Sequence, residues 1–374
     1  MFSPRYLMAI VVALAPHCAS AADGGTTQNA TLLDDDFFLQ GEYAGSQLCG
    51  DRGSGGTGLQ VVALGAGKFQ AVEYAGGLPG SGWDGRTRRK YLGALTSPGI
   101  AQLTGDGRRI TIRPRWAFLQ DAGGRSLGRL EKIVRLSQTL RAKPPPGAKV
   151  LFSGFDARQF AKGIVTTDHL LVAGADTRQP YGDFTLHLEF RTPYMPQARG
   201  QGRGNSGVYI QERYEVQVLD SFGLEGADNE CGSLYKQRAP LLNMSFPPLS
   251  WQTYDVDFTA ARFDKTGKKS RNARITVRQN GVIIQNDVEI TSKTGAGAAE
   301  GPNPRPIRLQ DHGNPVHFRN IWIVERNPSA ERRLLPAIAQ GSSAQEVLPE
   351  VQVSETAPER DLFRPDDLVH WTRP

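Results

Sequence analysis

The amino-acid sequence predicts an all-β protein with two domains, and two observations support this prediction. Short segments of alternating apolar and polar residues recur along the chain, with glycine-rich turns between them. The 374 residues include 42 glycines and 24 prolines, which favours turns and short strands over long helices. We therefore expect a smaller β-rich domain followed by a two-sheet sandwich or jelly roll.

Residues 1–21 have the organisation of a secretory signal peptide. Arg5 supplies the positive charge, Tyr6 to Ala15 form a short apolar run, and Ala19-Ser20-Ala21 fit a small-residue cleavage site. The run is too short to span a bilayer. A lipoprotein signal at Cys18 is the disfavoured alternative, because the residues before it are not small. We expect an exported protein, secreted or periplasmic, with no transmembrane segment.

Residues 34–142 are predicted to form the first, β-rich domain, whose role the sequence does not reveal. A linker follows at residues 143–147, Lys-Pro-Pro-Pro-Gly, because prolines cannot donate to a sheet and they stiffen an extended chain. The second domain is expected at residues 148–325. Residues 327–374 are rich in Ser, Ala, Glu and Pro without periodicity, which predicts a mostly disordered tail.

The charge argues against a nucleic-acid partner, and the cysteines argue against a structural zinc site. The net charge is only +6, and the densest basic run, residues 86–90, has no nucleic-acid motif beside it, so we expect a solvated turn and no nucleic-acid partner. Cys49 and Cys231 remain after signal cleavage, with no Cys/His cluster that would predict structural zinc. Two free thiols are favoured over a disulfide, which export would allow.

The second domain contains the clearest strands. In Asp183 to Arg191 the even-numbered positions are apolar, so they are predicted to enter the core while His187, Glu189 and Arg191 face away from it. Asn280-Gly281 lies between two alternating segments, which is a strong hairpin signal.

The segment Tyr214 to Asp220 carries the first set of candidate site residues. Glu215 and Gln217 share one face of a predicted strand, and a bulge near Leu219 would bring Asp220 to the same face. Three polar groups would then line one surface. By residue pattern alone, a merely solvated face is the alternative.

The segment Arg308 to Pro315 carries the second set. Gln310 and His312 share a face at a predicted strand end. A histidine in that position suits a base or a metal ligand, and it equally suits a loop-capping role. The sequence leaves both possibilities open.

These motifs resemble the 3-keto-disaccharide hydrolase domain family, a former domain of unknown function. The resemblance runs in order through five motifs over about 175 residues, and it includes a loop in the first domain, residues 77–85, that is found in an extension of some members. The matching motifs are Gly204 to Gly207, Tyr214 to Asp220, Trp251 to Asp255, Asn280 to Val282 and Leu309 to Trp322.

The resemblance implies a concanavalin A-like jelly roll that acts on carbohydrate, specifically on glycosides oxidised at C3. Laminarinase-type glycosidases share that fold and carry Glu-x-Asp-x-x-Glu, whereas this chain has Gln217 and Asp220 at the last two positions, which disfavours a usual acid–nucleophile pair. A C3 ketone instead permits β-elimination at C2 and C1 followed by hydration.

The resemblance implies the following roles for individual residues. Glu215, His312 and Asp220 are the acid–base or ligand candidates, and Arg191 would stabilise an enolate if it faces the same groove. Some members use a divalent metal ion, whose presence and identity in this chain the sequence leaves open. The expected sugar-binding residues are Gln217, Gln310, Arg191, Glu189 and Asn205.

Two alternatives to an enzyme stay open. The same fold could serve as a non-catalytic carbohydrate-binding module, or the chain could be a structural surface protein whose first domain does the main work. The loops Met195 to Arg203 and Phe263 to Arg271 are expected to be surface loops and not parts of a site. The aglycone, the anomeric preference and the oligomeric state are not predicted.

Overall fold

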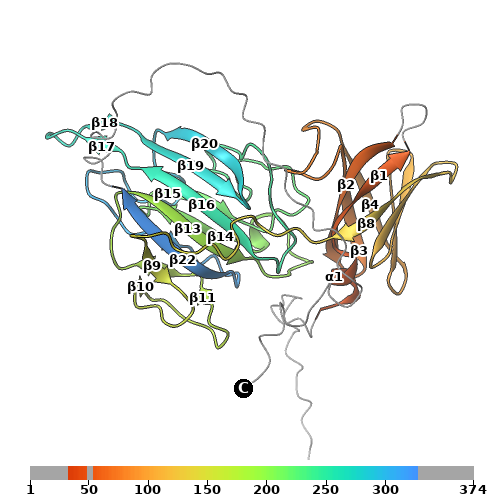
Figure 1. Ribbon diagram of the computed structural model, residues 1–374, viewed down its shortest axis with the longest axis horizontal. Helices are drawn as coiled ribbons and strands as arrows, with labels where there is room; N and C mark the ends of the chain where they lie inside the picture. Colours follow the sequence, from red (N-terminus) through yellow and green to blue (C-terminus); the bar gives the residue numbers. More distant parts are fainter. Residues whose placement is uncertain (1–32, 49–53, 327–374) are drawn as a thin grey trace, which may run out of the picture.

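The structure is a computed structural model that describes residues 33–48 and 54–326. The predicted signal peptide, Cys49 and the predicted tail lie outside these residues. The described part contains a β-barrel and a β-sandwich that lie end to end along the long axis (Figure 1). Within it, no helix is long and apolar enough to cross a membrane.

The barrel is closed and antiparallel, and each strand pairs with its neighbours in chain order from β1 round to β8. Its elements are α1 (Asp35–Leu39), β1 (Gly41–Leu48), β2 (Ser54–Gly65), β3 (Lys68–Ala75), β4 (Arg88–Ser97), β5 (Ile100–Gly105), β6 (Arg108–Ile112), β7 (Trp116–Asp121) and β8 (Ser126–Ile133).

Alternation fills the barrel interior with apolar side chains such as Tyr43, Phe69 and Leu103. Close approach of strands needs glycine at Gly93, where a Cβ atom would lie 1.9 Å from a backbone oxygen of β5. Helix α1 is capped by Asp34, whose side chain accepts a hydrogen bond from the Phe37 amide.

The sandwich consists of a five-stranded sheet, in the order β10-β12-β21-β14-β15, and a seven-stranded sheet, in the order β11-β22-β13-β16-β19-β20 with β9 on β22. Its elements are β9 (Lys149–Phe152), β10 (Phe160–Ala161), β11 (Leu171–Val172), β12 (Ala175–Thr177), β13 (Asp183–Arg191), η3 (Gly200–Gly202), β14 (Ser206–Ile210), β15 (Tyr214–Val218), β16 (Gln252–Thr259), β17 (Arg262–Phe263), β18 (Lys269–Arg271), β19 (Ala273–Gln279), β20 (Val282–Ile290), β21 (Arg308–Leu309) and β22 (His317–Arg326).

The sandwich core lies between the inward faces of these two sheets. Leu186 and Phe190 of β13 and Val216 and Val218 of β15 belong to one buried cluster, as their alternation predicts. The β19–β20 turn at Asn280-Gly281 has left-handed φ angles of 55° and 86°, as a tight hairpin requires. The prediction of an all-β jelly-roll sandwich is confirmed.

Within the segment between the two domains, residues 137–142 lie against the outward face of the seven-stranded sheet, and we call them the strap. The Thr139 hydroxyl donates to Asp255, the Arg141 amide donates to Glu189, and the carbonyl of Ala142 accepts from Asn320. The prolines at 144–146 therefore follow a stretch of chain that is hydrogen-bonded to the sheet.

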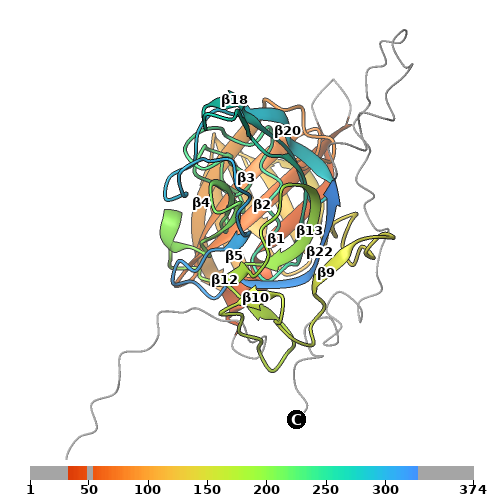
Figure 2. The same cartoon turned by 90° about the vertical axis from the view of Figure 1, so that its left-hand side faces the viewer.

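The barrel and the sandwich make direct contacts besides the strap. Tyr194 of the sandwich donates its hydroxyl to Asp34 beside α1 and packs in the barrel core cluster with Leu249. Lys90, from the basic run expected to be only solvated, pairs with Glu225 of the sandwich. Figure 2 looks along this arrangement, with the barrel strands behind the sandwich.

Candidate functional site

The candidate site lies on the outward face of the five-stranded sheet. Because Val208, Val216 and Val218 point into the core, the residues between them point away from it. Strand register then aligns one row of side chains across four strands, and a second row lies two residues further along. The first row is Asp176, Arg308, Tyr209 and Glu215; the second is Gln310, Gly207 and Gln217.

Glu215 is the titratable group at the centre of this face. Its side chain is buried, the residue being 3% exposed, and its Oε2 accepts a hydrogen bond of 2.7 Å from the Tyr209 hydroxyl. Burial raises the pKa of Glu215 to about 7, although the Tyr209 hydrogen bond acts to lower it. Near neutral pH this carboxyl group can therefore both take and give a proton.

Gly207 makes room for that carboxyl group. A Cβ atom at position 207 would lie 2.5 Å from Oε1 of Glu215, so no other residue fits there without moving the carboxylate. The Gly-Asn-Ser-Gly motif of the sequence thus has a packing reason at its last position.

Gln217 is fixed by a network of side-chain amides. Its Nε2 donates to Oδ1 of Asn205 at 3.0 Å and to Oε1 of Gln201 at 3.2 Å, which uses both amide hydrogens. Among the described residues, Oε1 of Gln217 is buried and has no hydrogen-bond partner. Gln217 therefore presents a bare acceptor, while Asn205 supports it.

Gln310 presents a second such acceptor. Its backbone amide donates to the Gly207 carbonyl at 2.8 Å, and its Nε2 lies 3.4 Å from the Tyr209 hydroxyl oxygen. Its Oε1 is also buried without a partner among the described residues. Unsatisfied buried acceptors are costly in a folded protein, which makes them candidates for ligand contacts.

Arg308 brings a positive charge to the same row. Its guanidinium group pairs with Asp176 at 2.8 Å and with Glu212 at 2.7 Å. The Arg308 charge acts to lower the pKa of the Tyr209 hydroxyl, although burial and Glu215 raise that pKa overall. Tyr209, Arg308 and Gln201 were not predicted; for Arg308 a signal existed, since it lies two residues before Gln310.

His312 lies in the exposed loop that follows Gln310. The loop is tied to the edge of the site, because Oδ1 of Asn314 accepts from the Asn205 amide at 2.8 Å. Within the described residues His312 has no hydrogen bond or ion pair, so the structure places it near Gln310 without joining it to Glu215.

Asp220 is used differently from the prediction. Its Oδ2 accepts from Nε of Arg203 at 2.7 Å in a buried ion pair, and its Oδ1 accepts from the Phe222 amide. Arg203, expected in a surface loop, is likewise buried. Both carboxylate oxygens of Asp220 are thus engaged by Arg203 and by the Phe222 amide, which makes Asp220 a structural partner of the loop.

Glu189 and Arg191 were predicted as sugar-binding residues, with Arg191 near an enolate if it faced the groove of Glu215, and the structure does not bring them to Glu215. Both belong to β13 of the seven-stranded sheet, so they lie on the opposite outward face of the sandwich. Glu189 pairs with Arg319 at 2.7 Å, and the Arg191 guanidinium lies 5.1 Å from the Trp251 ring. Alternation separates inward from outward residues but does not tell which outward face a strand supplies.

A divalent metal ion, which the resemblance implies for some members, finds no conventional ligand set here. Among the described residues, no group of three His, Cys, Asp or Glu side chains is arranged to hold a metal ion. The Glu215 carboxyl group accepts a hydrogen bond from Tyr209, and Cys231 is a buried free thiol in the core. We assign no step to a metal.

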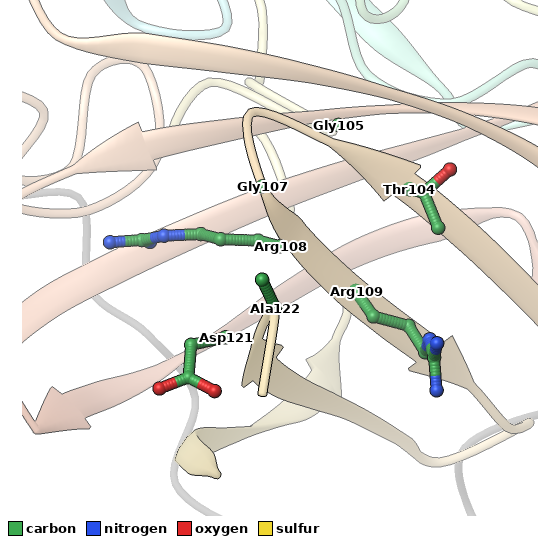
Figure 3. A pocket seen from close by; sticks show the side chains of 7 residues that line it. All are labelled: Thr104, Gly105, Gly107, Arg108, Arg109, Asp121 and Ala122. Atoms are coloured by element: carbon green, nitrogen blue, oxygen red, sulfur yellow. The ribbon is translucent and has the colours of Figure 1, made fainter. Parts of the chain in front are cut away.

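The barrel has a hollow of its own, of about 390 Å³, at the end formed by the β5–β6 and β7–β8 turns (Figure 3). Nearby, the buried carboxylate of Glu73 pairs with Arg89 and Arg108. None of the predicted site residues lines this hollow. The residues that line it are Thr104, Gly105, Gly107, Arg108, Arg109, Asp121 and Ala122.

Comparison with known proteins points to one family. The family described as 3-keto-alpha-glucoside-1,2-lyase-like domain matches residues 155–324. Three crystal structures from Parabacteroides distasonis ATCC 8503, each called a "putative glycosyl hydrolase", are similar to this chain at 35%, 20% and 22% identity. They cover 49%, 48% and 48% of this chain and 85%, 94% and 99% of their own, with TM-scores of 0.45, 0.37 and 0.34. No curated protein matches the chain.

Proposed function

This chain belongs to the 3-keto-alpha-glucoside-1,2-lyase-like domain family, and from that premise we propose that it cleaves glycosides that carry a ketone at C3. The reaction is an elimination in which Glu215 is the base. Addition of water to the product completes a net hydrolysis.

The elimination follows from the acidity that a C3 ketone gives to the proton on C2. The carboxylate of Glu215 takes this proton, and the electron pair of the C2–H bond passes through the enolate to form the C1–C2 double bond. The bond from C1 to the glycosidic oxygen breaks, and that oxygen leaves as an alcohol after it receives a proton. His312, on the exposed loop beside Gln310, is our candidate for the donor of that proton.

One observation carries this proposal: burial raises the pKa of Glu215 to about 7, and a tyrosine orients its carboxyl group. A general base works best when its pKa lies near the working pH. A binding module needs acceptors and donors for hydroxyl groups but no such base, so Glu215 favours the enzyme over the carbohydrate-binding module.

The neighbouring groups suggest how the sugar lies. Oε1 of Gln217 and Oε1 of Gln310 can only accept hydrogen bonds, so they suit hydroxyl groups and cannot bind a ketone oxygen. We therefore place the ketone on the side of the row that holds Tyr209 and Arg308, where the N–H donors of Arg308, already paired with Asp176 and Glu212, would face the enolate oxygen. Arg308 thus takes the role expected of Arg191.

The test is incubation of the protein with a 3-keto-glucoside, with and without a chelator, while product release is followed. We expect turnover that needs the C3 ketone, because the parent glucoside lacks an acidic C2 proton. If the sugar binds but is not turned over, even after divalent metals are added, the protein is a carbohydrate-binding module and the enzyme hypothesis is rejected.

We also propose that the protein is exported, secreted or periplasmic, since residues 1–21 have the pattern of a signal peptide. Mass spectrometry of the mature protein should find cleavage near Ala21. An intact Met1, or a lipid on Cys18, would refute this proposal.

A further inference from the structure

The loop of residues 195–203 connects the barrel to the candidate site, and one arginine fixes it to the barrel. Nη2 of Arg199 donates to the carbonyl of Leu64 near the end of β2 at 2.8 Å. Nη1 of the same guanidinium donates to the carbonyls of Pro196 and Ala198 at 2.6 and 2.7 Å. A single side chain thus joins the loop's own backbone to the barrel.

Two further contacts hold the loop in place. Gly65, with φ of 82°, lies against Gln197, and a Cβ atom on it would be 2.6 Å from that side chain. At the other end of the loop, Arg203 forms the buried ion pair with Asp220, and its Nη1 lies 3.5 Å from the carbonyl oxygen of Ala63. The end of β2 therefore supports the loop along its length.

The supported loop presents Gln201 to the site from the short helix η3. Nε2 of Gln201 donates to the carbonyl of Asn229 at 2.7 Å, which leaves its Oε1 as an acceptor. That oxygen accepts from Gln217 at 3.2 Å and from Asn205 at 3.3 Å. Gln201 and Asn205 together hold the amide end of Gln217 and leave its oxygen bare, and Gln201 accepts from both of the other side chains.

We propose that Gln201 is a positioning residue that makes Gln217 present an acceptor oxygen to a substrate hydroxyl group, and that the barrel is the support that holds Gln201 there. This inference rests on the proposed function. It assigns the barrel a role in specificity: an amide held in this orientation selects a sugar that carries a hydroxyl group at the contacted carbon over one that lacks it.

The experiment compares Gln201→Ala, Arg199→Ala and Gln217→Ala in the full chain, with Lys90→Ala as control. Lys90 also pairs across the barrel–sandwich boundary, but with Glu225 and away from the loop. The probes are a 3-keto-glucoside and its single-deoxy analogues. Losing one neutral hydrogen bond should raise KM about 3- to 10-fold with kcat little changed.

The decisive readout is the preference for the substrate over its deoxy analogues. Gln217→Ala should lose the preference over the analogue that lacks the hydroxyl group at one ring position. Gln201→Ala and Arg199→Ala should lose the preference at that same position, whereas Lys90→Ala should keep it. Gln201→Glu, which retains the acceptor oxygen, should restore part of it. Native preference in Gln201→Ala or Arg199→Ala would overturn the proposal.

Equilibrium binding separates this proposal from the proposed function. The same substitutions are placed in a Glu215→Gln chain, and dissociation constants for the 3-keto-glucoside and its deoxy analogues are measured by calorimetry. If the native chain never turns over substrate but these constants show the expected pattern, the elimination fails and the positioning role stands. If the native chain turns over substrate but the substitutions leave the dissociation constants unchanged, the elimination stands and the positioning role fails. If no sugar binds at all, both proposals are refuted.

Discussion

The two outward faces of the sandwich each bury a glutamate, and the two carboxyl groups have opposite properties. Glu215 is 3% exposed and Glu189 is 0% exposed. Burial raises the pKa of Glu215 to about 7. Burial also acts to raise the pKa of Glu189, but hydrogen bonds from His187 and Asn320 and the Arg319 charge bring it down to about 2.

The difference lies in the partners and not in the depth of burial. Glu189 has an arginine, an asparagine, a nearby histidine and the strap amide of Arg141 around it. Glu215 has a neutral tyrosine as its side-chain partner. A fully paired carboxylate holds structure together, whereas a poorly paired one can exchange a proton.

The largest expected effect is on turnover. Glu215→Gln should lower kcat on a 3-keto-glucoside by about 10²- to 10⁴-fold, because it removes the base and keeps the shape. Glu189→Gln, the matched variant on the other face, should keep kcat within about 3-fold wherever the protein is folded. Equal losses in both variants, measured well below their melting temperatures, would break the comparison.

For stability we expect the opposite, with Glu189→Gln losing more free energy of unfolding than Glu215→Gln. Glu189→Gln removes the carboxylate that pairs with Arg319, whereas His187 keeps Asp255 at 2.7 Å. Breaking a buried ion pair typically costs about 3–5 kcal/mol. Chemical denaturation at pH 7 measures this free energy of unfolding. A loss no larger than that of Glu215→Gln would show that the network on the seven-stranded sheet is not structural.

The pH dependence of stability sharpens the comparison further. The folded-state pKa of Glu215 lies above its unfolded value, so its contribution to stability is present below pH 4.5 and is lost as the pH rises to about 7. Glu215→Gln has no such group to titrate. Between pH 4.5 and pH 8 its free energy of unfolding should therefore rise by up to about 3 kcal/mol relative to that of the native protein. Glu189, with its lowered pKa, contributes above pH 4.5 and loses that contribution toward pH 2. Denaturation curves at several pH values give the slopes, and a flat difference between native protein and Glu215→Gln would contradict the raised pKa.

The smallest expected effect concerns Tyr209. Its hydrogen bond acts to lower the pKa of Glu215, so Tyr209→Phe should raise this pKa, by about one unit. The limb of the kcat/KM profile on which activity rises with pH should move upward accordingly. A profile that stays in place would show that Tyr209 does not tune the base.

Sequence pattern predicted much of the fold and the centre of the site. The alternation in β13 and β15 placed Phe190 and Val216 in the core and Glu215 and Gln217 outside it, as the structure has them. Closure of the barrel was beyond that pattern, because β1 pairs with β8 across most of the first domain and local periodicity contains no register.

The differences at the site have two physical origins, the identity of the two outward faces in the sequence pattern and contacts made by loops. Period-two alternation is identical on the two outward faces of a sandwich, so Arg191 and Glu189 could not be told from residues that share the face of Glu215. The predicted bulge at Leu219 concerned backbone geometry, whereas the partner of Asp220 is Arg203, seventeen residues earlier at the end of η3. Contacts made by loops, such as those of Gln201, leave no periodic signal.

The pairing of β22 fixes when the sandwich can be completed during synthesis. Strands β9, β11 and β13 all pair with β22, and the strap bonds to Asn320 and Trp322 of the same strand, 178 and 180 residues after Ala142. The last described strand to leave the ribosome is therefore an interior strand of its sheet. The barrel, whose strands pair in chain order, can close while that sheet still lacks β22, and the side chains of His187 and Glu189 stay in water until then.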